Sequence, residues 1–389
     1  MARDYDIVVF GATGYTGSLV TDYLARSKPA LRWAIAGRDE EKLAERSQEL
    51  RSKSSVEVPY LVASASEPAS LARLAMSARV VLTTVGPYAK LGEPVVEACI
   101  AAGTDYVDVT GEPEFVANMI HKYEGAANAA GVRLVPCAGF DSVPHDLGVF
   151  FVMDAMRPKG PVEVEAFVHA SGGFSGGTWQ SALGAFASLR DKDKRNIPHL
   201  TSPGRRVTAR PLRPRFEPEV SGWVLPMPSI DPQIVLRSAG ALDLYGPAFS
   251  YGHYVRVGSL GKAVGLAVGV GGAIGLAQLG PARTLMSRLK RAGDGPSADA
   301  RTRGFFRVTI LAKSEAEKVI ARVSGGDAYE ETAKMASEAA LLLATQRDAL
   351  PARAGFLTPA SAFGNHLVER LDRAGVRFEI VRRLREGAS

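Results

Sequence analysis

Apolar and polar residues alternate along the first third of the chain in a pattern of short strands and longer helices. Short apolar runs predict buried strands, and between them apolar residues recur every three or four positions, which predicts helices. Strands that alternate with helices predict an α/β fold with a doubly wound parallel sheet. The predicted strands are Asp6–Phe10, Arg32–Ala36, Pro59–Ala63, Arg79–Thr83, Tyr106–Val109 and Arg133–Pro136.

After residue 148 the pattern changes to an α+β one. Residues 191–233 are rich in Pro and Arg and predict a long connection, which is often functional or mobile. The other predicted elements are strands at Val162–His169 and Phe249–Val257, a hairpin of Phe305–Ala312 and Lys318–Val323, and a helix at Tyr329–Ala344. We therefore expect a first domain at 1–148, an α+β domain for substrate and dimerisation at 149–350, and a C-terminal segment at 351–389 that packs back on the first domain.

One segment of the second domain, Ala263–Ala282, is uncharged and long enough to cross a bilayer as a helix. Its glycines weaken a helix in water. Three interpretations remain open: a buried core or subunit-interface element, a membrane-surface or lipid-channel element, and a true span. We expect a flexible apolar element that touches lipid peripherally without spanning a membrane. The glycines of this segment are Gly265, Gly269, Gly271, Gly272 and Gly275.

Residues 10–17 read FGATGYTG, where a predicted strand meets glycines and a helical pattern begins. Such a turn aims unpaired backbone N–H groups and a helix dipole at one spot, which suits a pyrophosphate. Gly11 permits the tight turn, Gly14 lets a phosphate approach, and Gly17 lets the helix pack on its strand. A turn that binds nothing is the alternative. The expected dinucleotide contacts in this Rossmann-type turn are Gly11, Thr13, Gly14, Tyr15, Thr16 and Gly17.

The second predicted strand ends in Gly37-Arg38. An acid at this position usually binds the ribose 2′-hydroxyl of NAD, whereas an arginine accommodates the 2′-phosphate of NADP. Arg38 is followed by Asp39, so a charge-paired surface turn is the alternative. We expect NADP(H), with Arg38 on the 2′-phosphate.

Composition narrows the class of partner. Lys+Arg 47 against Asp+Glu 41 gives a net charge of +6, a mild excess that suits phosphate-bearing or acidic partners. The sequence lacks the signatures of nucleic-acid binding, so we expect no nucleic acid. Cys99 and Cys137 lack C-x-x-C spacing, and the N-terminus runs straight into a strand without the organisation of a signal peptide. We expect a cytoplasmic protein.

Several motifs together resemble a known family. FGATGYTG, AGR, VGPY, YVDVTGE and GFDSVPHDLG resemble the NADP-binding half of saccharopine dehydrogenase-like oxidoreductases. SGGFSGGT, LPMPSIDP, GPAFSYGHY, GDGPS, GDAYEETAKMASEAAL and FLTPASAFG resemble the branch called trans-acting enoyl reductases. The resemblance runs over nearly the whole chain. It implies an NADPH-dependent reductase that works in trans on polyketide-synthase products and reduces a carbon–carbon double bond in phthiocerol-type lipids.

Such a reduction needs the nicotinamide, a donor for the oxyanion and a proton source. Gly86 and Pro87 follow a predicted strand and are expected beside the nicotinamide ribose; an ordinary turn is the alternative. Tyr88 offers a phenolic proton, although tyrosines are also common packing residues. We interpret Tyr88 as a candidate proton donor.

The loop GFDSVPHDLG is the second candidate for catalysis. Asp141, Ser142 and His145 cluster in it with two prolines, and a helix is expected to start near Pro144. Helix capping is the alternative role for Asp141 and Ser142. Histidine side chains in general titrate near neutrality, but the resemblance does not make His145 catalytic. We keep Asp141 and His145 as catalytic candidates.

Other residues are expected to face the same cleft. Glu112 opens the helix after the fifth strand, where a carboxylate also favours the helix dipole. Ser175 and Thr178 lie in SGGFSGGTWQ and are candidate substrate or cofactor contacts, with helix capping as the alternative. The sequence shows no metal cluster and no Tyr-x-x-x-Lys pair.

Two other functions remain open: a saccharopine-type imine or amine oxidoreductase, and a non-catalytic NADP-binding scaffold. The expected substrate is a polyketide or lipid acyl chain, free or on an acyl carrier protein. An acidic carrier could dock on an arginine-rich stretch, which otherwise reads as a solvated surface. This stretch, RRVTARPLRPR, contains Arg205, Arg206, Arg210, Arg213 and Arg215.

Overall fold

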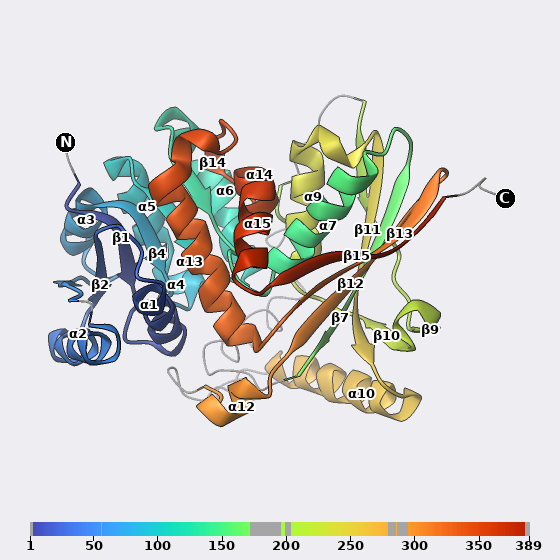
Figure 1. Ribbon diagram of the computed structural model, residues 1–389, viewed down its shortest axis with the longest axis horizontal. Helices are drawn as coiled ribbons and strands as arrows, with labels where there is room; N and C mark the ends of the chain where they lie inside the picture. The colour runs from blue at the N-terminus through green and yellow to red at the C-terminus, as the bar shows by residue number, and fades with distance from the viewer. Residues whose placement is uncertain are drawn as a thin grey trace.

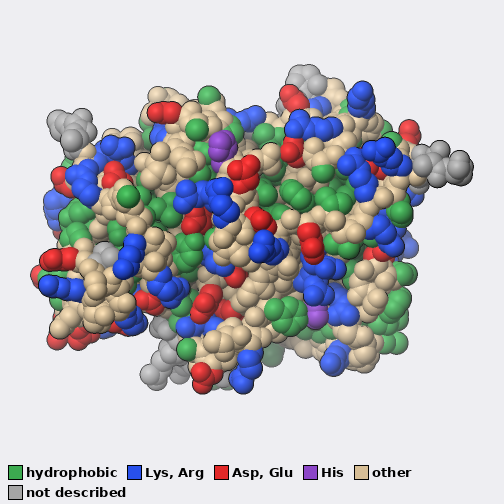
Figure 2. Space-filling model, viewed as in Figure 1, with side chains coloured by type: hydrophobic (Ala, Val, Ile, Leu, Met, Phe, Trp, Pro, Cys, Tyr) green, Lys and Arg blue, Asp and Glu red, His purple; other side chains and the backbone are tan. Residues whose placement is uncertain are grey.

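Two β-sheets lie side by side with helices packed between them (Figure 1). The computed structural model describes residues 3–55, 57–171, 196–198, 204–278, 285 and 295–385 of the 389-residue chain. Acidic and basic side chains are interspersed over the face shown in Figure 2.

The first sheet has seven parallel strands in the order β14-β6-β5-β4-β1-β2-β3. The order of β1 to β6 is that of a doubly wound dinucleotide-binding sheet, which confirms the predicted fold class. Successive strands are added on one side of β1 up to β3 and on its other side from β4 onward. Ligands are therefore expected beyond the carboxyl ends of β1 and β4, where this order changes. The strands are β1 (Tyr5–Phe10), β2 (Trp33–Gly37), β3 (Tyr60–Val62), β4 (Ala78–Thr83), β5 (Asp105–Asp108), β6 (Arg133–Val135) and β14 (Gly355–Phe356).

The helices that connect these strands begin and end at residues suited to helix ends. Asp39 caps one helix by accepting from the Lys42 amide at 3.2 Å, and three others start with Pro in the first turn. Gly103 ends a helix in the left-handed conformation. The helices are α1 (Tyr15–Ser27), α2 (Glu40–Ser54), α3 (Pro68–Ser77), α4 (Tyr88–Leu91), α5 (Glu93–Ala102) and α6 (Pro113–Ala129).

The second sheet is mixed, with the order β15-β13-β12-β7-β11-β10-β9 and β8 paired to β11. β12 and β13 form an antiparallel hairpin, as predicted, and the predicted strands at 162–169 and 249–257 are present as β7 and β11. The strands are β7 (Val162–Ala170), β8 (Arg206–Ala209), β9 (Arg215–Glu217), β10 (Gly222–Pro226), β11 (Ala248–Val257), β12 (Phe306–Ser314), β13 (Glu317–Gly325) and β15 (Arg377–Arg385).

Helices between the sheets join the two halves (Figure 1). A Cβ on Gly148 of α7 would lie 2.5 Å from Ile310 Cδ1, so this helix packs closely on the second sheet. α13, which confirms the helix predicted at 329–344, packs on α1 and on strands of the first sheet. These helices are α7 (Val143–Met156), α9 (Asp231–Ala241), α13 (Ala328–Gln346), α14 (Pro359–Phe363) and α15 (Asn365–Arg373).

The C-terminal part of the chain therefore contributes to both sheets. α13 lies before residue 350 yet covers the first sheet, β14 extends that sheet beside β6, and β15 forms an edge of the second sheet. The remaining helices in the described part of the chain are α10 (Leu260–Ala277), α12 (Ala298–Thr302) and the 3₁₀ turns Pro218–Val220, Asp243–Tyr245 and Arg347–Ala349.

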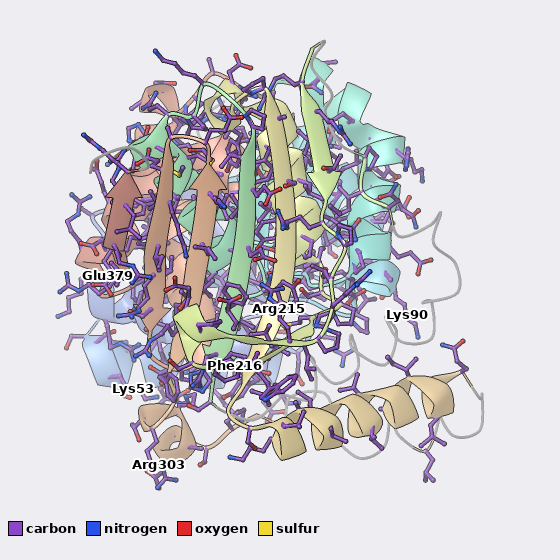
Figure 3. All side chains as sticks on the ribbon, turned by 90° about the vertical axis from the view of Figure 1, so that its right-hand side faces the viewer. Lys53, Lys90, Arg215, Phe216, Arg303 and Glu379 are labelled. Carbon is purple, nitrogen blue, oxygen red and sulfur yellow. The ribbon has the colours of Figure 1, made fainter. Side chains whose placement is uncertain are left out.

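The apolar segment expected at 263–282 forms most of α10, a continuous helix rather than a flexible element. It lies across the ends of strands of the second sheet (Figures 1 and 3). Its most apolar window is 12% buried, so the interpretation as a core element is wrong for this chain.

Candidate functional site

The glycine turn connects β1 to α1 at the point where the strand order reverses. Gly11 has a φ of 94°, which favours glycine. A Cβ on Gly17 would lie 2.1 Å from the Gly11 carbonyl oxygen, so only glycine lets the helix approach the turn this closely. Thr13 and Gly14 are exposed, and the amides of the first turn, at Tyr15 and Thr16, have no partner within the helix. This geometry fits a phosphate group.

Arg38 follows the carboxyl end of β2, the strand next to β1, and is exposed. Asp39 caps α2 and its carboxylate lies 3.3 Å from Lys42 Nζ. The Lys42 contacts lower the pKa of Asp39 most, and the nearby charge of Arg38 adds to this effect, so the two residues also interact through their charges. A free guanidinium at this strand end fits a 2′-phosphate, so the residues present fit NADP(H).

The loop after β4 lies beside the glycine turn, because the Thr84 amide donates to the Phe10 carbonyl at 2.9 Å. Gly86 and Pro87 lie in this loop. The Tyr88 side chain is buried, and its hydroxyl donates to the Thr83 carbonyl at 3.1 Å. Burial raises the pKa of the Tyr88 phenol well above its ordinary value. This geometry does not present Tyr88 as a proton donor and gives it a packing role.

Glu112 holds the same loop from the side of β5. Its carboxylate accepts from the amides of Tyr88, at 3.1 Å, and Ala89, at 2.9 Å. Glu112 is the N-terminal cap position of α6, but its side chain makes no capping hydrogen bond there. Its role is to position the loop after β4.

Asp141 lies in the loop between β6 and α7. A Cβ on Gly111 would lie 2.9 Å from Asp141 Oδ2, so the loop after β5 leaves room for this carboxyl group. Solvent reaches the side chain, yet burial by the surrounding protein raises the pKa of Asp141 to about 6. The negative charge of Asp231 raises it further and His145 lowers it. A carboxyl group with such a pKa can exchange a proton near neutral pH.

A buried polar cluster lies behind Asp141. His145 of α7 places Nδ1 3.1 Å from Asp231 Oδ1, and His253 of β11 places Nε2 3.6 Å from Asp231 Oδ2. The two imidazole rings are 4.6 Å apart, and the Tyr251 hydroxyl lies 3.2 Å from His253 Nδ1. Three elements far apart in the sequence thus bring two histidines onto one carboxylate.

Burial dominates the electrostatics of this cluster. It lowers the pKa of His253 to about 3, and the charge of His145 adds to the effect. Burial alone would raise the pKa of Asp231, but the charge of His145, whose Nδ1 lies 3.1 Å from the carboxylate, brings that pKa below its ordinary value. Burial raises the pKa of Asp146, on α7 next to His145, to about 7.

Many polar atoms of the cluster lack a hydrogen-bond partner in the described part of the chain. Buried polar groups are normally paired, so such a concentration suggests water or a polar ligand. Ser142 occupies the N-cap position of α7 without a capping hydrogen bond, which makes the capping interpretation of its side chain wrong. The unpartnered atoms belong to Ser142, His145, Asp146, Asp231, Tyr245 and His253.

Comparison with known proteins decides the family. Residues 7–135 match the family described as the saccharopine dehydrogenase NADP binding domain. A Mycobacterium tuberculosis protein provisionally named a trans-acting enoyl reductase is 40% identical over 98% of both chains. A trans-acting enoyl reductase of Mycobacterium ulcerans is 34% identical over 96% of this chain and 97% of its own. The chain belongs to the trans-acting enoyl reductase family.

This member of the trans-acting enoyl reductase family is an NADP-dependent oxidoreductase, as the motifs and Arg38 predict. Its fold is that of saccharopine dehydrogenase. The apo enzyme from Saccharomyces cerevisiae, the L-Glu-forming type, covers 97% of this chain and 100% of its own with a TM-score of 0.55 and 11% identity.

The structure brings together some of the predicted site residues of this enoyl reductase family member. Asp141 and His145 share one region, whereas Tyr88 is packed away, and Ser175 and Thr178 lie outside the described residues. Sequence reasoning missed Asp231 and His253, although both lie in the motifs LPMPSIDP and GPAFSYGHY. Among the described residues no group of three or more His, Cys, Asp or Glu side chains could hold a metal ion.

The arginine-rich stretch is not a uniformly free basic surface. Arg205 donates to the Ala239 carbonyl at 2.7 Å, Arg210 pairs with Glu163 at 2.5 Å, and Arg215 pairs with Glu165 at 2.9 Å. The interpretation as a solvated loop is therefore wrong for these three arginines. Arg206 and Arg213 are exposed.

Proposed function

We propose that this reductase acts in trans on an activated carbon–carbon double bond of a polyketide or long-chain lipid intermediate. The similarity to trans-acting enoyl reductases, 40% and 34% identical over nearly the full length, supports this substrate class. The observation that carries the chemistry is the position of Asp141, an exposed residue in the loop after β6 that feels the charges of a buried His–Asp–His cluster.

NADPH, when bound, supplies a hydride to the substrate. The glycine turn binds its phosphates through backbone amides, and Arg38 binds the 2′-phosphate. Asp141 holds a proton on its carboxyl group and donates it to the carbon atom next to the activating carbonyl. Solvent then returns a proton to Asp141, because its side chain is accessible.

His145, Asp231 and His253 are positioning residues in this proposal. Two of them act on Asp141 through their charges. The charge of Asp231 raises the pKa of the Asp141 carboxyl group, and the charge of His145 lowers it. No arginine forms a hydrogen bond or ion pair with these three residues in the described part of the chain.

A lipid substrate also agrees with a peripheral contact between this protein and membranes, which we include in the proposal. An acyl carrier protein is the expected vehicle for a substrate delivered in trans. Arg206 and Arg213, which are exposed, are the members of the arginine-rich stretch that support a carrier contact. A homodimer formed through the second domain completes the proposed assembly.

The test follows NADPH oxidation at 340 nm with an α,β-unsaturated acyl pantetheine thioester, with the same acyl group on a carrier protein, and with an imine formed from a 2-oxo acid and an amine. Turnover of the thioesters is expected. Asp141→Asn should lower kcat by roughly 10²- to 10⁴-fold at unchanged NADPH affinity. The control Asp243→Asn, at a carboxylate whose side chain is 96% exposed, should leave kcat unchanged.

The outcomes separate the candidate functions. NADPH binding without turnover of any substrate would identify a non-catalytic scaffold and refute the reductase proposal. Oxidation with the imine alone would identify a saccharopine-type enzyme. If Asp141→Asn turns over like the wild type, the proton comes from elsewhere.

A further inference from the structure

Helix α10 exposes apolar side chains on the outside of the protein. It has 18 residues, a mean hydropathy of 1.6, and is the only helix of the described chain that is long and apolar enough to cross a membrane. The exposed fraction is 55% for Val264, 70% for Val268 and 50% for Leu276. Figure 3 shows the helix lying across the end of the second sheet with much of its length away from the strands.

The exposed residues are not confined to one stripe of the helix. Ala263 and Ala277 are buried and Ile274 is half-buried, so these residues mark the side that faces the protein. At 100° per residue, Val268 and Leu276 lie on other sides of the helix. A surface helix of a soluble protein normally carries polar residues there. Lys262 is the one charged residue of α10.

The glycines of α10 have no packing role among the described residues of the chain. A Cβ added at any of them would meet no atom within 4 Å. Each glycine is less favourable than alanine in a helix by about 1 kcal/mol, so a helix with this many glycines depends on contacts with its surroundings. In hydrocarbon the backbone must form its own hydrogen bonds, which favours the helix. These glycines are Gly261, Gly265, Gly269, Gly271, Gly272 and Gly275.

Aromatic and basic side chains lie at the same end of the second sheet. Trp223 pairs with Val257, just before α10 begins, and its ring is 6.5 Å from that of Phe216, which is 53% exposed. Lys262 and Arg303 are exposed, and Figure 3 shows Phe216 and Arg303 at the α10 end of the molecule. Aromatic rings prefer the membrane interface, and each basic residue near an anionic surface contributes about 1 kcal/mol.

Topology excludes a membrane span. α10 follows β11 and precedes β12, and both strands pair with β7 in the same sheet. A single crossing would put β11 and β12 on opposite sides of the bilayer. A return crossing between α10 and α12 would have to carry charged residues through hydrocarbon, which is costly; the sequence there contains Arg283, Arg288, Lys290, Arg291 and Asp294.

We infer that α10 is an in-plane membrane-binding helix that docks the protein on an anionic lipid surface. Its apolar sides enter the boundary between headgroups and acyl chains, while Phe216, Trp223 and the flanking basic residues lie at headgroup level. The inference deepens the proposed lipid function, but its structural argument rests on α10 and its neighbours alone.

The experiment uses the full-length protein without NADPH or acyl substrate, so its result is independent of the proposed reaction. Flotation is measured with vesicles of phosphatidylcholine and phosphatidylglycerol, and with phosphatidylcholine alone. The wild type should bind the anionic vesicles more strongly. Val268→Asp should weaken binding at least about tenfold, which corresponds to burial of one aliphatic side chain. Met76→Asp, at a methionine of α3 that is 57% exposed, should bind like the wild type.

Two further measurements decide how α10 is used. Amide hydrogen exchange should slow in Leu260–Ala277 when vesicles are added, and carbonate washing should release the protein. No binding by the wild type, or equal binding by Val268→Asp, would overturn the inference. Retention after carbonate washing would also overturn it. So would a homodimer, seen by sedimentation, that Val268→Asp breaks without any vesicle binding, because a second copy would then cover the helix.

Discussion

Replacing Gly17 with alanine tests the phosphate-binding turn directly. The new Cβ would lie 2.1 Å from the Gly11 carbonyl oxygen and 2.8 Å from Thr84 Oγ1. Real Cβ contacts to such atoms are at least 3.0 Å, so the Gly11 carbonyl must retreat by about 0.9 Å or α1 must tilt away from β1. Either movement displaces the amides that hold the pyrophosphate.

The expected losses have two parts. Overpacking against backbone costs about 1–3 kcal/mol of folding stability, because the Gly11 carbonyl cannot rotate away as a side chain would. NADPH affinity should fall by about tenfold or more, since a loss of 1.4 kcal/mol in phosphate contacts is already tenfold. NADPH fluorescence titration measures the affinity, and thermal unfolding without coenzyme measures the stability.

Gly125→Ala is the matched control. Gly125 lies within α6, and a Cβ there would meet no atom within 4 Å. This change should raise stability by about 0.5–1 kcal/mol through helix propensity and leave NADPH binding unchanged. If Gly17→Ala binds NADPH like the wild type and melts at or above the wild-type temperature, the close approach of α1 to Gly11 is refuted.

Other substitutions probe the remaining charges. Arg38→Asp should weaken NADPH relative to NADH by about tenfold or more in the same titration, and equal affinity of the wild type for both coenzymes would contradict the assignment. Burial raises the pKa of Asp146 to about 7, so its contribution to stability falls as the pH rises from about 4 to 7. The free energy of unfolding of Asp146→Asn, measured in urea, should therefore rise relative to that of the wild type between pH 5 and pH 8. Burial lowers the pKa of His253 to about 3, so its contribution is lost as the pH falls below about 6.5. His253→Gln should therefore lose less free energy of unfolding than the wild type as the pH falls. The same pH dependence in both proteins would show that His253 is not buried as the neutral base.

The strands and the glycine turn were predictable because they are local. A strand such as β1 needs only its own apolar run, and the Gly11–Gly17 spacing acts within one turn. The His145, Asp231 and His253 cluster was not predictable in this way. It forms only when α7, α9 and β11 pack together, and no local pattern specifies that packing.

Two local patterns pointed in the wrong direction. From the sequence, Tyr88 was expected to present a free phenol. In the structure its hydroxyl donates a hydrogen bond to the carbonyl of Thr83, which belongs to the strand before the turn. The glycines of α10 predicted a poor helix from propensity in water. The structure nevertheless has a continuous helix at Leu260–Ala277.

The position of β14 sets the order in which the protein can be completed during synthesis. The ribosome delivers β1 to β6 first, but the strand that closes the β6 edge arrives only at residues 355–356, after nearly the whole second sheet. α13, which covers the same sheet, arrives shortly before it. A nascent chain that ends near residue 148 would leave an open strand edge and an uncovered apolar face. The coenzyme-binding half is thus the first to be synthesised and among the last to be finished.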